Sequence, residues 1–400
     1  MDVNRNRLTN QLTFFMPKTK LIICILAGET SGDKHASKLV QSLKSRLGNL
    51  EFYGLGGPEL IRENVRIITH ISKLAMIGLS GATKVFPEAY RTYKKLKKEF
   101  TENKPDLIIP VDYGGFNLRV CKLAHKFNIP VYYYIPPKIW AWNQKRVHKL
   151  RRFTKKVFVI NQFELDFYQH HGIDAIYVGN PSAQEIKNYK FESDFKLKNG
   201  LNPNDPLITI FPGSRKKEVS FMFSIFLKAA IIIAKEKPNM QFMVARPEQI
   251  SEEFLNSFCK TLPFKIIFKE NDSFNLMKNS DFLILKSGTT TLEAGIIGTP
   301  MVVSYIVDSL SYFLGKILIK AKYMSLVNLY LNKPSVKELL QKEVTPDNIS
   351  REALKTLNDP EYLADKNNDL SVLTQLLGDD IPSEKVADII IKELKATTVN

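Results

Sequence analysis

The chain has 400 residues, of which 44% are hydrophobic and 24% charged, and its formal net charge is +16. This length favours two domains over one, and the balanced composition argues against a disordered or fibrous protein. The positive charge favours anionic partners, without choosing among nucleic acid, anionic lipid and phosphorylated substrates.

The start of the chain and its cysteines favour a cytoplasmic protein. Residues 1–20 form a polar N-terminal extension, and the short apolar run after them is interpreted as a core strand rather than an export signal. No segment reaches the roughly 20 apolar residues that a spanning helix needs. Cys24, Cys121 and Cys259 show no metal-ligand spacing and no disulfide framework, which fits a reducing cytosol.

The first half of the chain alternates β-rich runs with helical stretches. Such alternation predicts parallel βαβ units in a doubly wound sheet, and we expect one domain over 21–180. The expected strands are Leu21–Ala27, Glu51–Leu55, Leu107–Val111, Val131–Ile135, Val157–Ile160 and Ala175–Val178.

The alternation stops over 181–206, which is polar and proline-rich and is predicted to be a linker. It resumes over 207–360 and predicts a second domain, followed by C-terminal helices over 361–400 that pack back on the fold or on a partner. The expected fold is thus α/β, with two doubly wound, Rossmann-like domains facing each other across a cleft. Ligands of such sheets bind beyond the carboxyl ends of the strands. The second set of expected strands is Leu207–Phe211, Gln241–Ala245, Lys265–Phe268, Asp281–Leu285 and Met301–Tyr305.

Two loops of the second half have the composition of phosphate-binding turns. After the first strand, Gly213 and Ser214 make a tight turn before Arg215 and Glu218 at a helix start, where N–H groups and a guanidinium favour an anion. An ordinary βα turn with a solvated arginine explains this segment equally well.

The second loop follows the strand that ends at Leu285 and contains Ser287, Gly288, Thr289 and Thr290. Glu293 lies one turn further on, where its carboxylate can accept hydrogen bonds from ribose hydroxyls; a capping box is the alternative. Together the two loops indicate a nucleotide diphosphate site. Neither is a Walker loop or a G-x-G-x-x-G turn, which disfavours NTP hydrolysis and NAD chemistry.

The first half offers carboxylates for acid–base chemistry. Asp112 directly follows the strand Leu107–Val111 and can act as a general base on an alcohol, although aspartate is also common in βα turns. Glu29 and Asp33 lie in the loop after the first strand and compete for the same role.

Apolar and basic segments of the first half indicate contact with lipid. Trp140 and Trp142 can stack on a sugar or acyl chain or simply pack a loop, and a basic run of 145–156 follows them. The apolar segment around Met76 precedes a lysine-rich helix of 84–100, an arrangement that suits either a monotopic membrane contact or a buried connection.

The sequence resembles the lipid-A-disaccharide synthase family from about residue 20 to about 345. The resemblance rests on blocks that occur in one order: Gly28-Glu29-Thr30-Ser31-Gly32-Asp33, Gly54-Leu55-Gly56-Gly57-Pro58, Ala75-Met76-Ile77-Gly78, Asp112 with Phe116-Asn117, Trp140-Ala141-Trp142 with Lys145-Arg146, Pro212-Gly213-Ser214-Arg215 with Glu218-Val219, Ser287-Gly288-Thr289 with Leu292-Glu293, Pro300-Met301-Val302-Val303, and Tyr323-Met324-Ser325-Leu326-Val327-Asn328.

The resemblance implies an inverting transferase of the GT-B fold that needs no metal or other cofactor. It implies transfer of 2,3-diacylglucosamine from its UDP derivative to 2,3-diacylglucosamine 1-phosphate (lipid X), giving the β-1,6 lipid A disaccharide 1-phosphate and UDP. The implied location is cytoplasmic, peripherally on the anionic surface of the inner membrane, and the implied assembly is a homodimer that exchanges C-terminal elements.

The resemblance also implies roles for individual residues. Asp112 matches the general base, and Arg215 joins it as a catalytic residue. The UDP side takes Gly213, Ser214, Glu218, Ser287, Gly288, Thr289, Thr290, Glu293 and Asn328. The acceptor side takes Glu29, Ser31, Asp33, Met76, Asn117, Trp142 and Lys145.

The sequence departs from the family pattern at four positions, which concern substrate choice and rate more than reaction class. Gly115 stands where the family often has aspartate, Asn180 replaces a histidine, Gln184 an aspartate and Pro136 a serine.

Two other functions compete with a transferase. One is a UDP-amino-sugar epimerase on the same two-domain plan, which would not need lipid contact. The other is a nucleic-acid binder, against which the chain lacks a recognised module and aromatic residues interleaved with its basic runs. We therefore expect no nucleic-acid partner.

Overall fold

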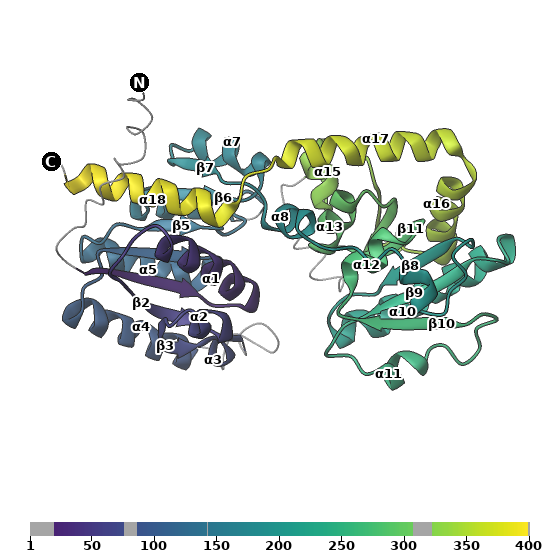
Figure 1. Ribbon diagram of the computed structural model, residues 1–400, viewed down its shortest axis with the longest axis horizontal. Helices are drawn as coiled ribbons and strands as arrows, with labels where there is room; N and C mark the ends of the chain where they lie inside the picture. The colour runs from purple at the N-terminus through teal and green to yellow at the C-terminus, as the bar shows by residue number, and fades with distance from the viewer. Residues whose placement is uncertain (1–19, 76–85, 142, 307–321, 399–400) are drawn as a thin grey trace, which may run out of the picture.

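The computed structural model describes residues 20–75, 86–141, 143–306 and 322–398. These residues form two α/β domains, each built on a parallel sheet, which lie side by side (Figure 1). The predicted fold class is confirmed.

The first sheet has the strand order β3-β2-β1-β4-β5-β6-β7, and every pairing in it is parallel. Residues 23–27 of β1 are buried throughout, as the near-continuous apolar run of a strand covered on both faces requires. The order reverses between β1 and β4, which creates a crevice at the carboxyl ends of these two strands. The bounds are β1 Leu21–Ala27, β2 Leu50–Gly56, β3 Arg66–His70, β4 Leu107–Val111, β5 Tyr132–Tyr134, β6 Lys156–Val159 and β7 Ala175–Tyr177.

Helices cover both faces of this sheet and bury two apolar clusters against it. In one cluster Leu39 and Val40 of α1 pack with Ile390 near the end of the chain. In the other, Leu96 and Phe100 of α4 pack with residues of α5, α6 and α7. The bounds are α1 Thr30–Lys44, α2 Pro58–Arg62, α3 Ile71–Ala75, α4 Phe86–Glu102, α5 Gly114–Lys126, η1 Gln144–Arg146, α6 Val147–Phe153 and α7 Gln162–His170.

The second sheet has the order β10-β9-β8-β11-β12-β13 and is also parallel. Its strands are β8 Leu207–Phe211, β9 Gln241–Arg246, β10 Ile266–Glu270, β11 Phe282–Lys286, β12 Met301–Tyr305 and β13 Lys337–Leu340. Its helices are α10 Lys216–Glu236, α11 Glu252–Asn256, α12 Ser273–Lys278, α13 Thr290–Ile297, α15 Leu326–Leu331, η2 Gln341–Glu343, α16 Pro346–Asn358 and α17 Pro360–Leu377.

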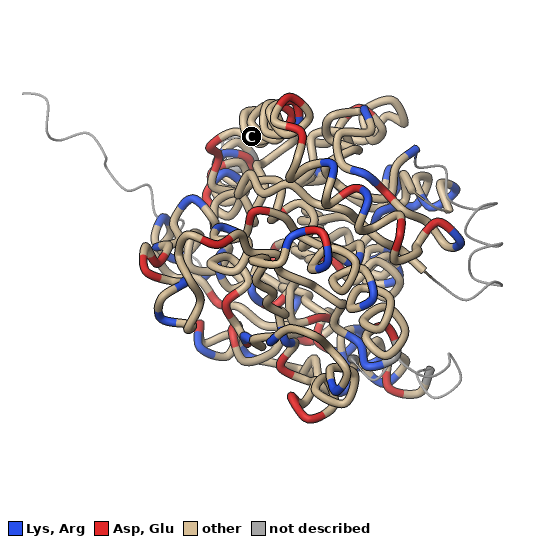
Figure 2. The backbone as a smooth tube through the Cα atoms, turned by 90° about the vertical axis from the view of Figure 1, so that its right-hand side faces the viewer, with Lys and Arg blue, Asp and Glu red and all other residues tan. Residues whose placement is uncertain are grey.

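Charged residues of both signs are distributed over the end of the molecule that belongs to the second domain. Seen from that end, lysine and arginine positions are interspersed with aspartate and glutamate positions along the backbone (Figure 2).

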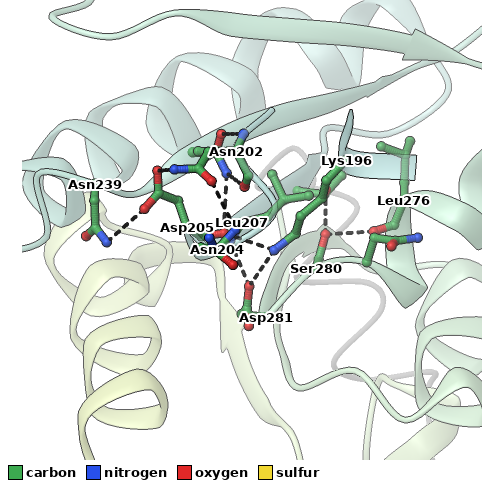
Figure 3. A network of polar contacts seen from close by, with 12 residues as sticks. Lys196, Asn202, Asn204, Asp205, Leu207, Asn239, Leu276, Ser280 and Asp281 are labelled. Carbon is green, nitrogen blue, oxygen red and sulfur yellow. Dashed lines mark hydrogen bonds and ion pairs between the residues drawn. The ribbon is translucent and has the colours of Figure 1, made fainter. Parts of the chain in front are cut away.

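The segment 181–206, predicted to be a linker, contains α8 (Pro181–Lys187) and α9 (Phe195–Lys198). Its second half is fixed to the amino end of the second sheet (Figure 3). Lys196 Nζ donates to the Asp205 carbonyl at 2.9 Å, and the carboxylate of Asp281 accepts from the Leu207 N–H at 2.8 Å. These hydrogen bonds make the end of this segment part of the second domain rather than a free connection.

The chain crosses between the domains a second time after α17. The final helix, α18 (Pro382–Thr398), packs on α1 of the first domain, where Arg46 pairs with Glu384 and Asp388 at 3.1 and 2.8 Å. At the crossing, Gly179 has φ +94°, and a Cβ there would lie 2.6 Å from the carbonyl oxygen of Asp380. The two connecting segments thus touch each other.

Candidate active site

The loops that follow β1, β4 and β8 bring charged residues of both domains together. Partial burial raises the pKa of Glu29; the neighbouring Asp112 raises it further and Arg215 lowers it. These influences place the Glu29 carboxylate within electrostatic reach of Asp112 in its own domain and of Arg215 in the other. The three residues come from separate parts of the sequence, and Glu29 lies within electrostatic reach of the other two.

Asp112 has an unusual backbone conformation that its neighbours fix. Its φ is +51°, in the left-handed region that costs a non-glycine residue on the order of 1 kcal/mol or more. Its carbonyl oxygen accepts hydrogen bonds at 2.8 Å from the Tyr133 hydroxyl and at 2.8 Å from the Asn117 amide. Such strain, held by surrounding hydrogen bonds, is typical of functional positions.

The Asp112 carboxylate is more basic than a solvated aspartate. Burial raises its pKa, and the Tyr113 N–H, which donates to Oδ1 at 2.8 Å, and the nearby Lys138 oppose that rise. A raised pKa improves a carboxylate as a proton acceptor near neutral pH.

Two glycines allow the loops around Asp112 to approach closely. A Cβ at Gly28 would lie 2.2 Å from the ring of Tyr113, and one at Gly114 would lie 2.2 Å from Pro137. Larger residues would therefore push the loop after β4 away from the loops after β1 and β5.

Asn117 and Asp33, both expected on the acceptor side, are fully buried and support the surrounding backbone. Asn117 Nδ2 also donates to the Leu26 carbonyl at 3.2 Å and so ties β1 to Asp112. Asp33 accepts from the N–H groups of Gly57 at 2.7 Å and Glu59 at 2.9 Å, which fixes the start of α2. Both side chains are buried rather than exposed to the cleft, and Asn117 Oδ1 has no hydrogen-bond partner among the described residues.

The other acceptor-side residues lie at different places in the first domain. Ser31 is exposed in the first turn of α1, and Lys145 is exposed in η1. Trp140, which is not one of the predicted acceptor-side residues, is held inside its loop, because its indole N–H donates to Glu164 at 2.9 Å. Met76 and Trp142 lie outside the described residues.

The two predicted phosphate loops of the second domain line a single pocket of about 290 Å³. Gly213 and Ser214 form one wall, and Ser287, Gly288, Thr289 and Thr290 form another. Lys286, at the start of the second loop, also lines the pocket. Four further polar side chains line it that the sequence analysis did not single out: Arg246, Lys269, Asn271 and Ser273. Their only signal was their position at or after the carboxyl ends of β9 and β10.

The pocket is suited to an anion. The N-termini of α10 and α13 open beside it, and helix N-termini favour negative charge. The Lys286 ammonium lies 3.3 Å from Glu218, and the Arg215 guanidinium lies 3.4 Å from the same carboxylate. Glu218 therefore positions two cations at the edge of this pocket.

Glu293 lies in the first turn of α13, near the first domain. Burial, together with the charge of Glu185, raises its pKa to about 6, and Lys34 opposes the rise. Lys34 of α1 pairs with Glu185 of α8 at 2.5 Å. Glu293 thus lies close to the contact between the two domains.

Asn328, expected on the UDP side, uses its side chain within the second domain. The amide donates to the Val336 carbonyl at 2.9 Å and to Glu338 at 2.8 Å, and it accepts from the Val336 N–H at 2.9 Å. Asn328 is not among the residues that line the pocket and instead anchors α15 to β13.

Within the described ranges, no three or more histidine, cysteine or acidic side chains are grouped closely enough to bind a metal ion.

The fold and this site define a class of protein. Two parallel-sheet α/β domains are the fold of GT-B glycosyltransferases and related epimerases. Solved structures with this fold include UDP-GlcNAc 2-epimerase from Neisseria meningitidis bound to UDP-GlcNAc, with a TM-score of 0.58 and 12% identity over 94% of this chain and 100% of that one. MurG from Acinetobacter baumannii matches with a TM-score of 0.57 and 14% identity over 94% and 100%.

The family follows from the sequence comparisons. The model of lipid-A-disaccharide synthetase matches residues 23–389. The lipid-A-disaccharide synthase of Geobacter metallireducens is 32% identical over 93% of this chain and 97% of its own, and that of Nitrosococcus oceani 34% identical over 86% and 89%. The chain belongs to the lipid-A-disaccharide synthase family and is a glycosyltransferase of lipid A biosynthesis. Its likeness to the epimerases is one of fold alone.

Proposed function

We propose that the chain transfers 2,3-diacylglucosamine from its UDP derivative to the 6-hydroxyl of 2,3-diacylglucosamine 1-phosphate, lipid X. Residues 21–180 bind the acceptor, and residues 207–360 bind the donor nucleotide. The family membership supports the reaction, and the position of the anion pocket in the second domain supports this division of labour.

The donor's diphosphate occupies the pocket between the N-termini of α10 and α13. Backbone N–H groups there, with Arg215 and Lys286 at the edge, offset the charge that develops on departing UDP. Glu293 accepts hydrogen bonds from the ribose. Asn328 contributes indirectly by holding α15 in place.

Asp112 takes the proton from the acceptor's 6-hydroxyl. The hydroxyl oxygen bonds to the anomeric carbon of the donor from the side opposite UDP, and the bond from that carbon to the diphosphate oxygen breaks. The proton stays on Asp112, and the negative charge leaves with UDP. The observation that carries this assignment is the position of Asp112 at the carboxyl end of β4, in a strained conformation that Tyr133 and Asn117 hold by hydrogen bonds.

Replacing the proposed base tests this mechanism. Asp112→Asn should lower turnover by roughly 100- to 10,000-fold, because an amide cannot accept the proton, and should leave UDP binding unchanged. The exposed Asp166 of α7 provides a matched control as Asp166→Asn. Both variants are assayed with the two acylated sugars, reading UDP release and disaccharide mass. Near-normal turnover of a folded Asp112→Asn enzyme excludes Asp112 as the base.

The acyl chains of the substrates require access to a membrane. We propose that α4 contacts the membrane surface, because its exposed side is rich in lysine. Lys94, Lys95, Lys97 and Lys98 of α4 are exposed, whereas Leu96 and Phe100 are buried in the domain. No helix among the described residues is long and apolar enough to cross a bilayer. We therefore include peripheral binding to the anionic, cytoplasmic face of the inner membrane in the proposal.

Changing the four α4 lysines to glutamine should weaken sedimentation with phosphatidylglycerol vesicles, by about 1 kcal/mol for each lysine close to the surface. The control changes four exposed lysines of the second domain, Lys228, Lys235, Lys260 and Lys342, in the same way. Equal losses in the two variants would assign the attraction to net charge rather than to α4.

A homodimer is part of the same proposal, and analytical ultracentrifugation measures it.

A further inference from the structure

A basic groove of about 440 Å³ runs between α5 and α6 in the first domain. No acidic side chain is among the described residues that line it. The lining residues are Gly115, Leu118, Arg119 and Lys122 of α5, Arg146 of η1, and His148, Lys149, Arg152 and Phe153 of α6.

The groove has an apolar floor beneath its cationic groups. Leu118 is buried, and Phe153 is partly buried, with the Arg152 guanidinium 5.7 Å from its ring centre. Lys122, Lys149 and Arg152 are exposed. Like charges gathered over an apolar surface repel one another, and a bound dianion relieves that repulsion.

One end of the groove lies at the proposed reaction centre. Gly115 is three residues after Asp112, at the start of α5 and so at the carboxyl edge of the sheet. Apart from its own helical turn, no atom of the described residues lies within 4 Å of the place where a Gly115 Cβ would stand, which leaves this end open among the described residues. Since an α-helix rises about 1.5 Å per residue, Lys122 lies roughly 10 Å further along α5 than Gly115.

We propose that this groove binds the phosphate monoester of the acceptor and thereby turns the acceptor's 6-hydroxyl toward Asp112. The inference rests on the proposed function and names a second anion site for it. The donor's diphosphate has its own pocket in the other domain, so the first domain needs a separate site for the acceptor's charge. The phosphate is on C1 and the 6-hydroxyl is on the substituent of C5, the two carbons bonded to the ring oxygen, so a cationic groove that begins beside the base can hold the phosphate while the hydroxyl faces Asp112.

The test removes three charges from the groove: Lys122→Gln, Lys149→Gln and Arg152→Gln in one chain. Steady-state kinetics are measured with the phosphorylated acceptor and with the same diacyl sugar lacking its phosphate. The KM for the phosphorylated acceptor should rise at least about tenfold, while the KM values for the donor and for the dephosphorylated acceptor stay within about twofold. Lys228→Gln, Lys235→Gln and Lys260→Gln form the control, with the same loss of charge in the second domain.

An unchanged KM for the phosphorylated acceptor, or an equal loss with both acceptors, overturns the proposal. Assays in neutral detergent micelles and on anionic vesicles separate the acceptor's phosphate from membrane headgroups. A rise in KM seen only on anionic vesicles would mean that the groove binds membrane headgroups, and this result also overturns the proposal. If the wild-type enzyme transfers to neither acceptor, the proposed function itself is wrong. If the wild type is active and the triple variant has an unaltered KM, only the assignment of the groove is wrong.

Discussion

At the scale of single residues, the first domain holds two carboxyl groups in fixed positions, one partly exposed and one buried. Asp112 is held at the cleft in a left-handed conformation by Tyr133 and Asn117. Glu164 lies wholly inside and accepts hydrogen bonds from Trp140 at 2.9 Å and Asn161 at 3.0 Å. The first group is the one that we propose as the base, and the second fixes the loop at Trp140.

Glu164 should make the protein's stability depend on pH. Burial raises its pKa from 4.5 to about 7, against the effect of its hydrogen bonds to Asn161 and Trp140. The folded state then holds the proton more tightly than the unfolded state, so this contribution is full below pH 4.5 and is lost as pH rises through 7. The loss amounts to about 3 kcal/mol.

Glu164→Gln should remove this dependence, because glutamine can still accept from Trp140 but does not titrate. Urea midpoints measured between pH 4.5 and 8 compare the wild type with this variant and with Glu236→Gln, an exposed control. Parallel pH profiles of the wild type and Glu164→Gln would show that the buried carboxyl is not the cause.

At the scale of elements, the turn between β8 and α10 determines where the anion pocket forms. Gly213 has φ +109°, which a side chain rarely adopts, and its missing Cβ would stand 3.1 Å from Glu218 Oε2. The turn therefore needs glycine both for its conformation and for the approach of the carboxylate that orients Lys286 and Arg215.

Gly213→Ala should destabilise this turn by about 1–2 kcal/mol and weaken UDP binding by about tenfold. Isothermal titration with UDP measures the effect. Gly200→Ala is the matched control, since Gly200 also has a positive φ, +71°, but has no atom near its Cβ position and lies outside the pocket. An equal loss of UDP affinity in both variants would show that the turn at Gly213 has no specific role in nucleotide binding.

Most of the elements could be predicted because buried parallel strands are continuous apolar runs. β1, β4, β8 and β12 have the expected bounds. β3 and β13 were missed, since both are edge strands with exposed or charged residues that carry no such run.

Site residues could be predicted where a loop follows a strand with a continuous apolar run. The roles of residues whose side chains point into the domain could not be predicted. The two phosphate loops could be paired because parallel strands end at one edge of a sheet. The inward orientation of Asp33 and Asn117 could not be predicted, because short polar side chains follow the same sequence pattern whether they bind a ligand or a neighbouring backbone group.

At the scale of the whole molecule, the domains are joined by two chain crossings and by side-chain contacts. The Tyr330 hydroxyl of α15 donates to Asn161 of the first domain at 2.9 Å. The final helix α18 buries Val386, Ala387 and Ile390 against the first domain. The first domain therefore depends on the last residues of the chain for part of its core.

Ile390→Ala should cost the first domain about 2–5 kcal/mol, because it empties a fully buried site. Hydrogen exchange of α1 amides should accelerate, while amides of β8 in the second domain should keep their protection and UDP should still bind. Lys392→Ala, on the exposed side of the same helix, is the control. Equal acceleration in α1 and β8 would mean that α18 stabilises both domains rather than the first.

The most direct test of the account is a crystal structure of the protein with UDP. We predict that the diphosphate lies against the Ser287–Thr290 turn and the start of α10. Arg215 and Lys286 should lie beside it, and the Asp112 carboxylate should lie across the cleft. UDP bound instead in the basic groove of the first domain, or away from both domains' strand ends, would contradict it.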